Sequence, residues 1–329
     1  MDSPPEHPLL EIRQESIDYI RKVHNLDKPG RMKEAVNILD EWAKKQTHFT
    51  KKDFNPKYLE TTIIACKGSL ERAKVQLDKI CTYRTLLPAF FGKFDVKKDV
   101  GNLYDIILPV MLPKLTADHY RVYLVKLFDK TLDPSQLMDY LKFGVVVGEY
   151  LKLHDYINGF LVLVDFREIN IMDLVTKINP VQLQQGLAIY IEAFGMRLKG
   201  IHILTPSKFV DAFITILKQV LSEKISKRIY VHKTIDTIYD CIPKEILPIE
   251  YGGKERSLKN LHEMWLELLS SKEHLDFLEE VRDVKTDESC RQADDFNGQY
   301  AGMPAQVRGY TRYPKYVRED EDLDHLQPQ

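Results

Sequence analysis

The sequence lacks three features that mark large classes of proteins. Its cysteines, Cys66, Cys81, Cys241 and Cys290, form no Cys-x-x-Cys pair, which argues against a zinc module or a disulfide framework and favours a reducing setting. No apolar run approaches the roughly 18 residues needed to cross a bilayer. The 47 basic and 49 acidic residues nearly balance, so the chain lacks the excess positive charge of a nucleic-acid-binding protein. We therefore expect a cytoplasmic protein whose membrane contacts are peripheral and transient.

Motifs of catalysis and metal binding are also missing. No glycine-rich nucleotide loop, Walker loop or Gly-x-Ser-x-Gly is present, and His262-Glu263 lacks the second histidine of a zinc protease. His202 and His232 lie in predicted strands with no clustered ligand, a setting more typical of core or surface histidines. Asp165 ends an apolar strand without an identifiable nucleophile or base beside it, which favours a structural role. We expect no enzyme activity, no cofactor and no metal.

The first part of the chain has the apolar spacing of helices. Positions such as Ala35, Leu39 and Trp42 recur at helical intervals, and Ser69 precedes a further amphipathic segment as a plausible N-cap. Leu86-Leu87-Pro88 ends this pattern. Residues 1–90 are therefore expected to form a small helical domain.

From Tyr104 onward, short β-rich runs alternate with helices of about four turns, which predicts an α/β fold with a mainly parallel sheet. The predicted strands cover residues 121–127, 160–166, 199–204 and 228–232, and the helices between them cover 134–152, 180–194 and a segment after residue 205. Strand 160–166 is almost continuously apolar and is expected at the centre of the sheet. A last helix is expected over 258–269. We assign residues 91–270 to this domain and 271–329 to a tail that is partly disordered or docked on the body.

The predicted helix after Thr205 has an unusually wide apolar face. Thr205-Pro206 combines a capping residue with a proline at the first helical position, so the helix is expected to start there. Its apolar face carries Phe209, Val210, Phe213, Ile214, Ile216, Leu217, Val220 and Leu221. Two interpretations remain open: a helix packed on a sheet, or a lid over an apolar cavity.

Four motifs, in order over residues 9–270, give the chain a specific resemblance. They are Gly68-Ser69-Leu70-Glu71-Arg72-Ala73-Lys74, Gly159-Phe160-Leu161-Val162-Leu163-Val164-Asp165, Lys199-Gly200-Ile201-His202-Ile203-Leu204 and Leu247-Pro248-Ile249-Glu250-Tyr251-Gly252-Gly253. The last matches the Leu-Pro-x-Glu-Tyr-Gly-Gly element of the CRAL-TRIO (Sec14-like) family. Within it, the chain most resembles the branch of alpha-tocopherol transfer and retinaldehyde-binding proteins, whose insect members have a similar tail rich in tyrosine and glycine.

The resemblance implies a helical N-terminal domain followed by a CRAL-TRIO α/β domain, whose sheet floors an apolar cavity under a helical lid. It also implies the lining of that cavity: Leu141, Gly144, Val145, Gly148, Val162, Val164, Ile189, Tyr190, Ile201, Ile203, Phe209, Phe213, Ile216 and Leu217. Gly144 and Gly148 lie four residues apart on one predicted helix, where glycine costs roughly 1 kcal/mol against alanine. Either a bulky ligand or close helix packing explains them.

A second implied site is a basic patch that binds phosphoinositide headgroups. Arg197, Lys199 and Arg228 match the patch of the family, and Lys67 is the nearest cation in the helical leader. Clustered basic side chains pair well with phosphate oxygens. The alternative is a solvated basic face.

Taken together, these patterns favour a monomeric carrier that moves a bulky hydrophobic molecule between membranes. Its ligand would be a tocopherol, a retinoid, a carotenoid or another isoprenoid-like lipid. Transfer of phosphatidylinositol or another phospholipid is the related alternative. From other classes come a non-catalytic interaction scaffold, with the acidic run at residues 319–322 recruiting a partner, and an enzyme of lipid metabolism.

Overall fold

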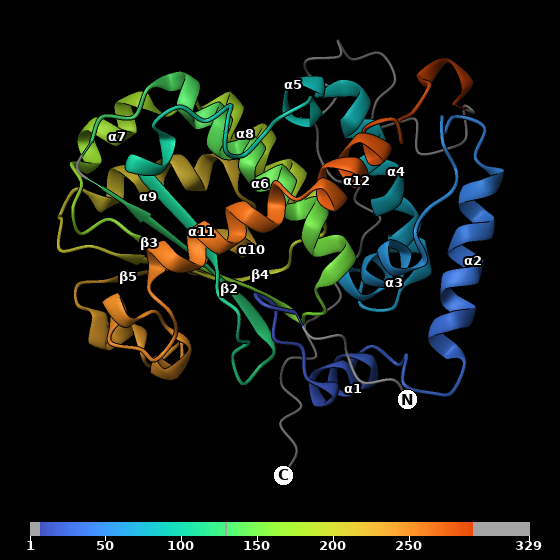
Figure 1. The fold of residues 1–329 in the computed structure, drawn as a ribbon, viewed down its shortest axis with the longest axis horizontal. Coiled ribbons are helices and arrows are strands. Elements are labelled where there is room, and N and C mark those ends of the chain that lie inside the picture. The colour runs from blue at the N-terminus through green and yellow to red at the C-terminus, as the bar shows by residue number, and fades with distance from the viewer. Residues whose placement is uncertain (1–6, 129, 292–329) are drawn as a thin grey trace.

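The N-terminal region is helical, as expected. The computed structural model describes residues 7–128 and 130–291 (Figure 1). Its first helices are α1 (Gln14–Val23), α2 (Arg31–Lys45), α3 (Pro56–Ala65), α4 (Leu70–Leu86) and the short α5 (Pro88–Phe91). Ser69 caps α4 by accepting a hydrogen bond from the backbone N–H of Arg72 at 3.4 Å. Helices α2, α3 and α4 pack on one another and bury Leu39, Leu59 and Leu77 completely.

A five-stranded, mostly parallel sheet forms the centre of the rest of the chain. Its strands lie in sequence order: β1 (Ile107–Met111), β2 (Tyr120–Leu127), β3 (Gly159–Asp165), β4 (Leu198–Leu204) and β5 (Ile229–His232). Strand β1 is antiparallel to β2, and all other neighbours are parallel. Strand β3 lies in the middle of the sheet, where its apolar sequence predicted it. The α/β prediction is confirmed.

The two faces of the sheet are covered by different segments (Figure 1). One face packs against α6 (Pro134–His154), α7 (Ile171–Lys177), α8 (Pro180–Ala188) and α9 (Val210–Val220). The other packs against the segment after β5, which contains the 3₁₀ turns Ile235–Ile238, Lys244–Ile246 and Ile249–Tyr251. The short α10 (Glu223–Ser226) joins α9 to β5.

Strand β1 was not predicted because of a proline in its sequence. It contains Pro109, which has no backbone N–H and therefore weakens the sequence signal for a strand. A proline is tolerated here because β1 is the edge strand and pairs only with β2. Helix α11 (Leu258–Leu269) lies along this edge, where the Trp265 indole donates to the Met111 carbonyl at 2.8 Å.

Helix α9 starts later than the sequence predicted. The backbone N–H of Thr205 donates to the His232 carbonyl at 2.8 Å, so Thr205 continues the pairing of β4 with β5. Two side-chain turns follow, in which the N–H of Ser207 donates to the Thr205 hydroxyl and that of Phe209 to the Ser207 hydroxyl. These turns delay the first helical residue to Val210.

The last described residues pack back onto the helical N-terminal region. After α12 (Lys272–Arg282), the Lys285 carbonyl accepts from the Thr50 N–H at 3.0 Å, and Arg291 forms a 2.9 Å ion pair with Asp78 of α4. The division at residues 90 and 270 stays a prediction. The predicted acidic run at 319–322 lies outside the described residues.

Candidate functional site: an apolar cavity between the sheet and helices α6 to α9

An apolar cavity of about 210 Å³ lies between the sheet and the helices that cover one of its faces. Alternate residues of β2 and β3 point into it because successive side chains of a strand face opposite ways. Its lining is Ile107, Met111, Tyr123, Val125, Leu127, Leu132, Leu137, Tyr140, Leu141, Gly144, Val147, Phe160, Val162, Val164, Phe166, Leu174, Ile178, Leu183, Leu187, Tyr190, Ile191, Met196, Leu198, Ile201, Phe213, Leu217 and Leu221. None of these described residues carries a charge.

Three tyrosines supply the hydroxyl groups of this lining. The Tyr123 hydroxyl on β2 donates to the Tyr140 oxygen on α6 at 3.2 Å, and the Tyr190 hydroxyl donates to the Leu141 carbonyl at 2.5 Å. Burial raises the pKa of Tyr140 to about 12 and that of Tyr123 and Tyr190 well above its usual value. All three are therefore neutral at physiological pH. Among the hydrogen bonds of the described residues, none uses the hydroxyl hydrogen of Tyr140, so this group can donate to a ligand.

The structure places eight of the predicted lining residues at the cavity and six elsewhere. At the cavity are Leu141, Gly144, Val162, Val164, Tyr190, Ile201, Phe213 and Leu217. Away from it are Val145, Gly148, Ile189, Ile203, Phe209 and Ile216. Ile189 and Ile203 are fully buried in the surrounding core, whereas Phe209 is 63% exposed. As ligand contacts, all of these residues remain predictions.

Close packing accounts for the two glycines of α6. A Cβ atom at Gly144 would overlap the Tyr190 hydroxyl, and one at Gly148 would lie 2.6 Å from the ring of Phe194. Tyr190 belongs to a single π-helical turn, Ile189–Ala193, that follows α8 and brings this segment against α6. Of the two explanations left open by the sequence, the geometry favours close packing at both positions. The packing at Gly144 also sets the position of Tyr190, which lines the cavity.

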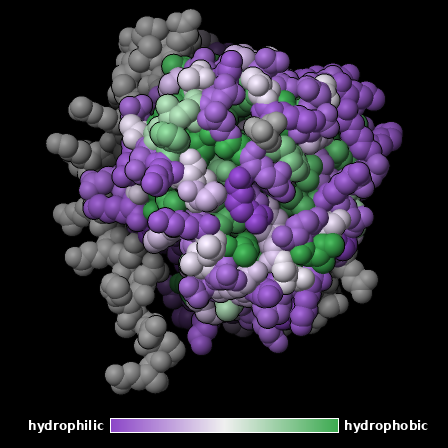
Figure 2. Space-filling model, turned by 90° about the vertical axis from the view of Figure 1, so that its left-hand side faces the viewer, coloured by the Kyte–Doolittle hydropathy of each residue, from purple (hydrophilic) through white to green (hydrophobic). Residues whose placement is uncertain are grey.

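Helix α9 covers the cavity with one face and meets solvent with the other. Phe213 packs edge-on against Phe166 with ring centroids 4.9 Å apart, and Leu217 is 6% exposed. Helices α7 and α9 follow the neighbouring strands β3 and β4. An exposed apolar residue lies near the start of each: Met172 is the second residue of α7, and Phe209 directly precedes α9. Figure 2 shows this side of the molecule, where apolar residues gather within a polar surround.

The three predicted basic residues gather at the amino ends of β4 and β5. Arg197 contacts His24 at 3.2 Å, Lys199 lies 5.2 Å from the centre of the Tyr120 ring, and Arg228 donates to the Leu198 carbonyl at 2.9 Å. Burial, and then the charges of Arg197, Lys67 and Lys199, lower the pKa of His24 to about 4. The fold therefore brings Lys67 of the helical leader into the same region.

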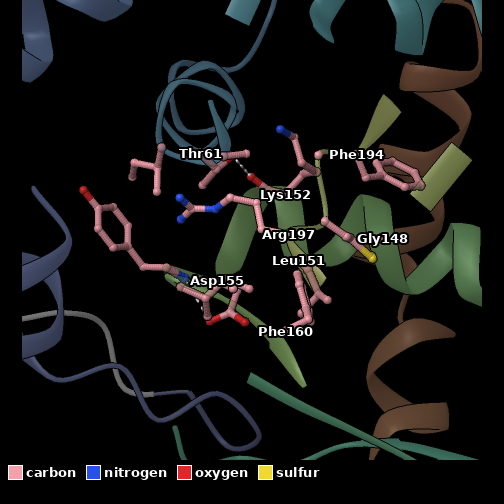
Figure 3. A pocket seen from close by; sticks show the side chains of 15 residues that line it. Thr61, Gly148, Leu151, Lys152, Asp155, Phe160, Phe194 and Arg197 are labelled. Carbon is pink, nitrogen blue, oxygen red and sulfur yellow. Dashed lines mark hydrogen bonds between the residues drawn. The ribbon is translucent and has the colours of Figure 1, made fainter. Parts of the chain in front are cut away.

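A smaller pocket of about 60 Å³ adjoins this basic region, between the helical leader and the sheet. Figure 3 shows Arg197 extending into it between Thr61 and Asp155. Lys152 also lines it and donates to the Thr62 hydroxyl at 2.6 Å. Burial lowers the pKa of Lys152 to about 7. The sequence did not single out Lys152, because a lysine near the end of an amphipathic helix is expected at the surface.

Sequence reasoning missed the cavity residues contributed by β1 and β2, and Ile191 of the π turn. Tyr123 and Val125 alternate in β2 with Val122 and Leu124, which are buried on the opposite face of the sheet, so the sequence carried no polar alternation that would mark the cavity side. Tyr140, one residue before Leu141 on α6, was hidden by the broad apolar character of that helix. No helix among the described residues is both long enough and apolar enough to cross a membrane.

Comparisons with known proteins found similarity over part of the chain. Residues 108–253 match the CRAL/TRIO domain. Human Clavesin-2 is 28% identical over 142 residues, covering 41% of this chain and 43% of that protein. Mouse alpha-tocopherol transfer protein-like is 27% identical over 125 residues, covering 38% and 35%. The chain thus matches less than half the length of these relatives. The crystal structure of Sfh5 aligns with a TM-score of 0.49 at 13% identity, covering 82% of this chain and 98% of that one.

Proposed function

We propose, from the premise that residues 108–253 form a CRAL/TRIO domain, that this chain binds a bulky, uncharged hydrophobic molecule and transfers it between membranes. The observation that carries the proposal is the cavity between the sheet and α6–α9, whose described lining bears no charge. Removing apolar ligand surface from water contributes roughly 25 cal/mol per Å², so a lipid-sized molecule can gain several kcal/mol there.

The polarity of the lining favours an isoprenoid-like ligand over a phospholipid. A phosphate placed among these side chains would have no counter-ion, and burying an unpaired charge is very costly. A single hydroxyl or carbonyl oxygen, in contrast, can accept the free hydrogen of Tyr140. A tocopherol, a retinoid or an oxygenated carotenoid has this combination of a long apolar body and few polar atoms.

Helix α9 is the proposed lid. It contributes Phe213 and Leu217 to the cavity and is joined to β4 by the non-helical segment 205–209, which offers a hinge. Phe209, at the start of α9, is exposed and can enter the boundary between lipid headgroups and acyl chains. Contact with a membrane would thereby favour opening and lower the barrier to ligand release.

The ligand prediction is tested by extracting the purified full chain with organic solvent and identifying the bound molecule by mass spectrometry. The chain is then titrated with retinol, tocopherol, a carotenoid and phosphatidylinositol. We expect stoichiometric uptake of an uncharged isoprenoid-like ligand. Val125→Phe, which fills the cavity from β2, should weaken that uptake at least tenfold while the protein stays folded. Uptake of phosphatidylinositol alone, or of no offered lipid, would contradict the proposal.

The lid is tested with Phe209→Asp and neutral phosphatidylcholine vesicles. Aspartate suits the N-cap position that Phe209 occupies, so the fold should be preserved. We expect slower transfer with unchanged equilibrium affinity for the ligand, because Phe209 lies outside the cavity. Gln219→Asp is the matched control, since it adds the same charge to the solvent-exposed face of α9. Equal slowing by both variants would show a charge effect and refute a role for Phe209.

We also propose that Arg197, Lys199 and Arg228 recognise an anionic headgroup at the membrane surface. Their gathering at the amino ends of two neighbouring strands, with Lys67 nearby, supports this. The double variant Arg197→Glu, Lys199→Glu should weaken binding to phosphoinositide vesicles and leave binding to neutral ones unchanged. The double variant Lys259→Glu, Lys272→Glu makes the same charge change at exposed positions on α11 and α12. Equal losses in the two double variants would refute a localised site.

Several broader features belong to the same proposal. The chain would act as a cytoplasmic monomer that touches membranes transiently and carries out no covalent chemistry. Its nearest branch would be that of the alpha-tocopherol transfer and retinaldehyde-binding proteins, including their insect members. Support comes from the similarity to mouse alpha-tocopherol transfer protein-like and from the uncharged cavity.

A further inference from the structure

Two histidines and a cysteine meet on the face of the sheet opposite the cavity. His202 of β4 pairs in register with Tyr230 of β5, so His232, two residues further along β5, faces the same side. The His202 Nδ1 and His232 Nε2 atoms lie 3.0 Å apart. Cys241, from the turn that follows, completes a group whose three ligand atoms all lie within 4.8 Å of one another. The sequence alone gave no reason to group these residues, because 30 or more positions separate His202 from the other two.

The hydrogen bonds around His232 fix which nitrogen carries its lone pair. The Thr237 hydroxyl donates to the Thr234 carbonyl at 3.0 Å, so its oxygen accepts from Nδ1–H of His232 at 2.9 Å. The Nε2 atom of neutral His232 is therefore an acceptor, aimed at His202. Metal-bound histidines commonly have their other ring N–H held in this way by a neighbouring oxygen.

The surroundings of His202 also suit a ligand. The Tyr230 ring stacks on it at 5.2 Å. Gly200 leaves room for the imidazole, because a Cβ atom there would lie 2.6 Å from His202 Nε2.

We propose that His202, His232 and Cys241 form a binding site for Zn²⁺, with a water molecule in the fourth position. Two nitrogens on one tetrahedral zinc ion are roughly 3.3 Å apart, given Zn–N distances of about 2.0–2.1 Å. The observed separation of 3.0 Å is close to this value. Cys241 is exposed, so its side chain can rotate toward the imidazoles and leave one side open to solvent.

The ligand set selects a borderline-soft metal ion over a hard one. Imidazole and thiolate are preferred ligands of zinc, whereas magnesium and calcium prefer oxygen. On binding, Cys241 releases its thiol proton to solvent, and the proton on Nδ1 of His202 moves to Nε2, so both rings stay neutral. The bound ion would link β4, β5 and the segment after β5 on the face of the sheet opposite the cavity.

Titration of the full chain with cobalt and zinc tests the site. The protein is prepared without a histidine tag, stripped of metal with a chelator and titrated with Co²⁺, followed by Zn²⁺. We expect one equivalent of Co²⁺ to produce a thiolate-to-cobalt absorption band in the near ultraviolet and the strong visible bands of tetrahedral cobalt. Zinc should then remove both. Failure to bind either metal stoichiometrically would overturn the proposal.

Cys241→Ser is the decisive variant, and Cys290→Ser is its matched control, since both cysteines are exposed. Loss of the thiolate should abolish the near-ultraviolet band and weaken zinc binding at least about tenfold. Substituting a residue that only hydrogen-bonds to a metal ligand already lowers metal affinity by about this factor. Cys290→Ser should retain both properties. His232→Gln, checked for folding by circular dichroism, should also lose the visible bands. A band that survives Cys241→Ser, or equal losses in both serine variants, would overturn the proposal.

Discussion

The two faces of the central sheet are packed in different ways. On one face, Val125 of β2 and Val162 of β3 border a cavity of about 210 Å³. On the other, Leu124 and Leu163 of the same strands are fully buried, and the segment after β5 packs against the neighbouring strand β4. At the centre of the sheet, the residues of β2 and β3 are apolar on both sides, so these residues do not cause the difference. It comes from the covering segments: helices held apart from the sheet on one side and compact turns on the other.

The polar groups follow the same division. On the filled face, Tyr251 donates to Asp165 at 2.8 Å, and His202 contacts His232. On the cavity face, the described lining offers only tyrosine hydroxyls as strong hydrogen-bonding side chains. Buried polar groups that are paired within the chain help to define one packed arrangement. The apolar cavity on the other face, in contrast, has room for a ligand.

The largest expected effect comes from shortening one leucine on each face of β2. Leu124→Ala, on the filled face, should lower the free energy of unfolding by about 3–4 kcal/mol, because it leaves a new cavity in a packed core. Leu127→Ala should cost only about 1–2 kcal/mol, since Leu127 already borders empty space and has fewer contacts to lose. Urea unfolding of the ligand-free protein measures both values.

The same pair of variants sharpens the comparison when a ligand is added. A molecule filling the cavity should increase the cost of Leu127→Ala and leave that of Leu124→Ala unchanged. Equal costs for the two variants without ligand would show that the two faces are packed alike.

The next effect is acid destabilisation, to which His202 on the filled face contributes. His202 has an ordinary pKa of 6.5 when unfolded and about 4 in the fold, so the unfolded chain binds its proton more tightly. The contribution of neutral His202 to the free energy of unfolding is fully present above pH 6.5 and is lost as the pH falls toward 4. At pH 5 the loss is about 2 kcal/mol. His232 contacts His202, and burial lowers the pKa of His232 as well.

Hydrogen exchange at pH 7 and pH 5, with a chelator present, measures this effect by region. Protection in β4 and β5 should fall more than protection in β2, whose cavity-facing residues include no histidine. Uniform loss of protection across the sheet would contradict this localisation.

The smallest effect concerns the polar end of the ligand. Tyr140→Phe should weaken binding of an alcohol or carbonyl ligand by about 1 kcal/mol, or roughly fivefold, and leave a hydrocarbon analogue unaffected. Tyr123→Phe is the control, because it keeps the Tyr140 hydroxyl. Fluorescence titration of both variants gives the affinities. Equal weakening for the alcohol and the hydrocarbon would mean that Tyr140 acts through shape alone.

Regular elements with strong local signals were predictable. The alternation of strands and helices identified β2 to β5 and the helices α6 and α8. Strand β1 was missed because Pro109 weakened its pattern, and the start of α9 was placed too early because Thr205 pairs with β5 instead of capping a helix. In both cases a contact with a distant strand decided the local structure.

The sequence by itself determined the order of strands and helices and the apolar character of the cavity-lining segments, because these depend on periods of two and 3.6 residues. Only the tertiary structure decided that Tyr190 packs against Gly144, that Lys67 joins Arg197, and that Cys241 meets two histidines. Local periodicity assigns each side chain to a face of its own element. Which distant face it meets depends on how the whole chain packs.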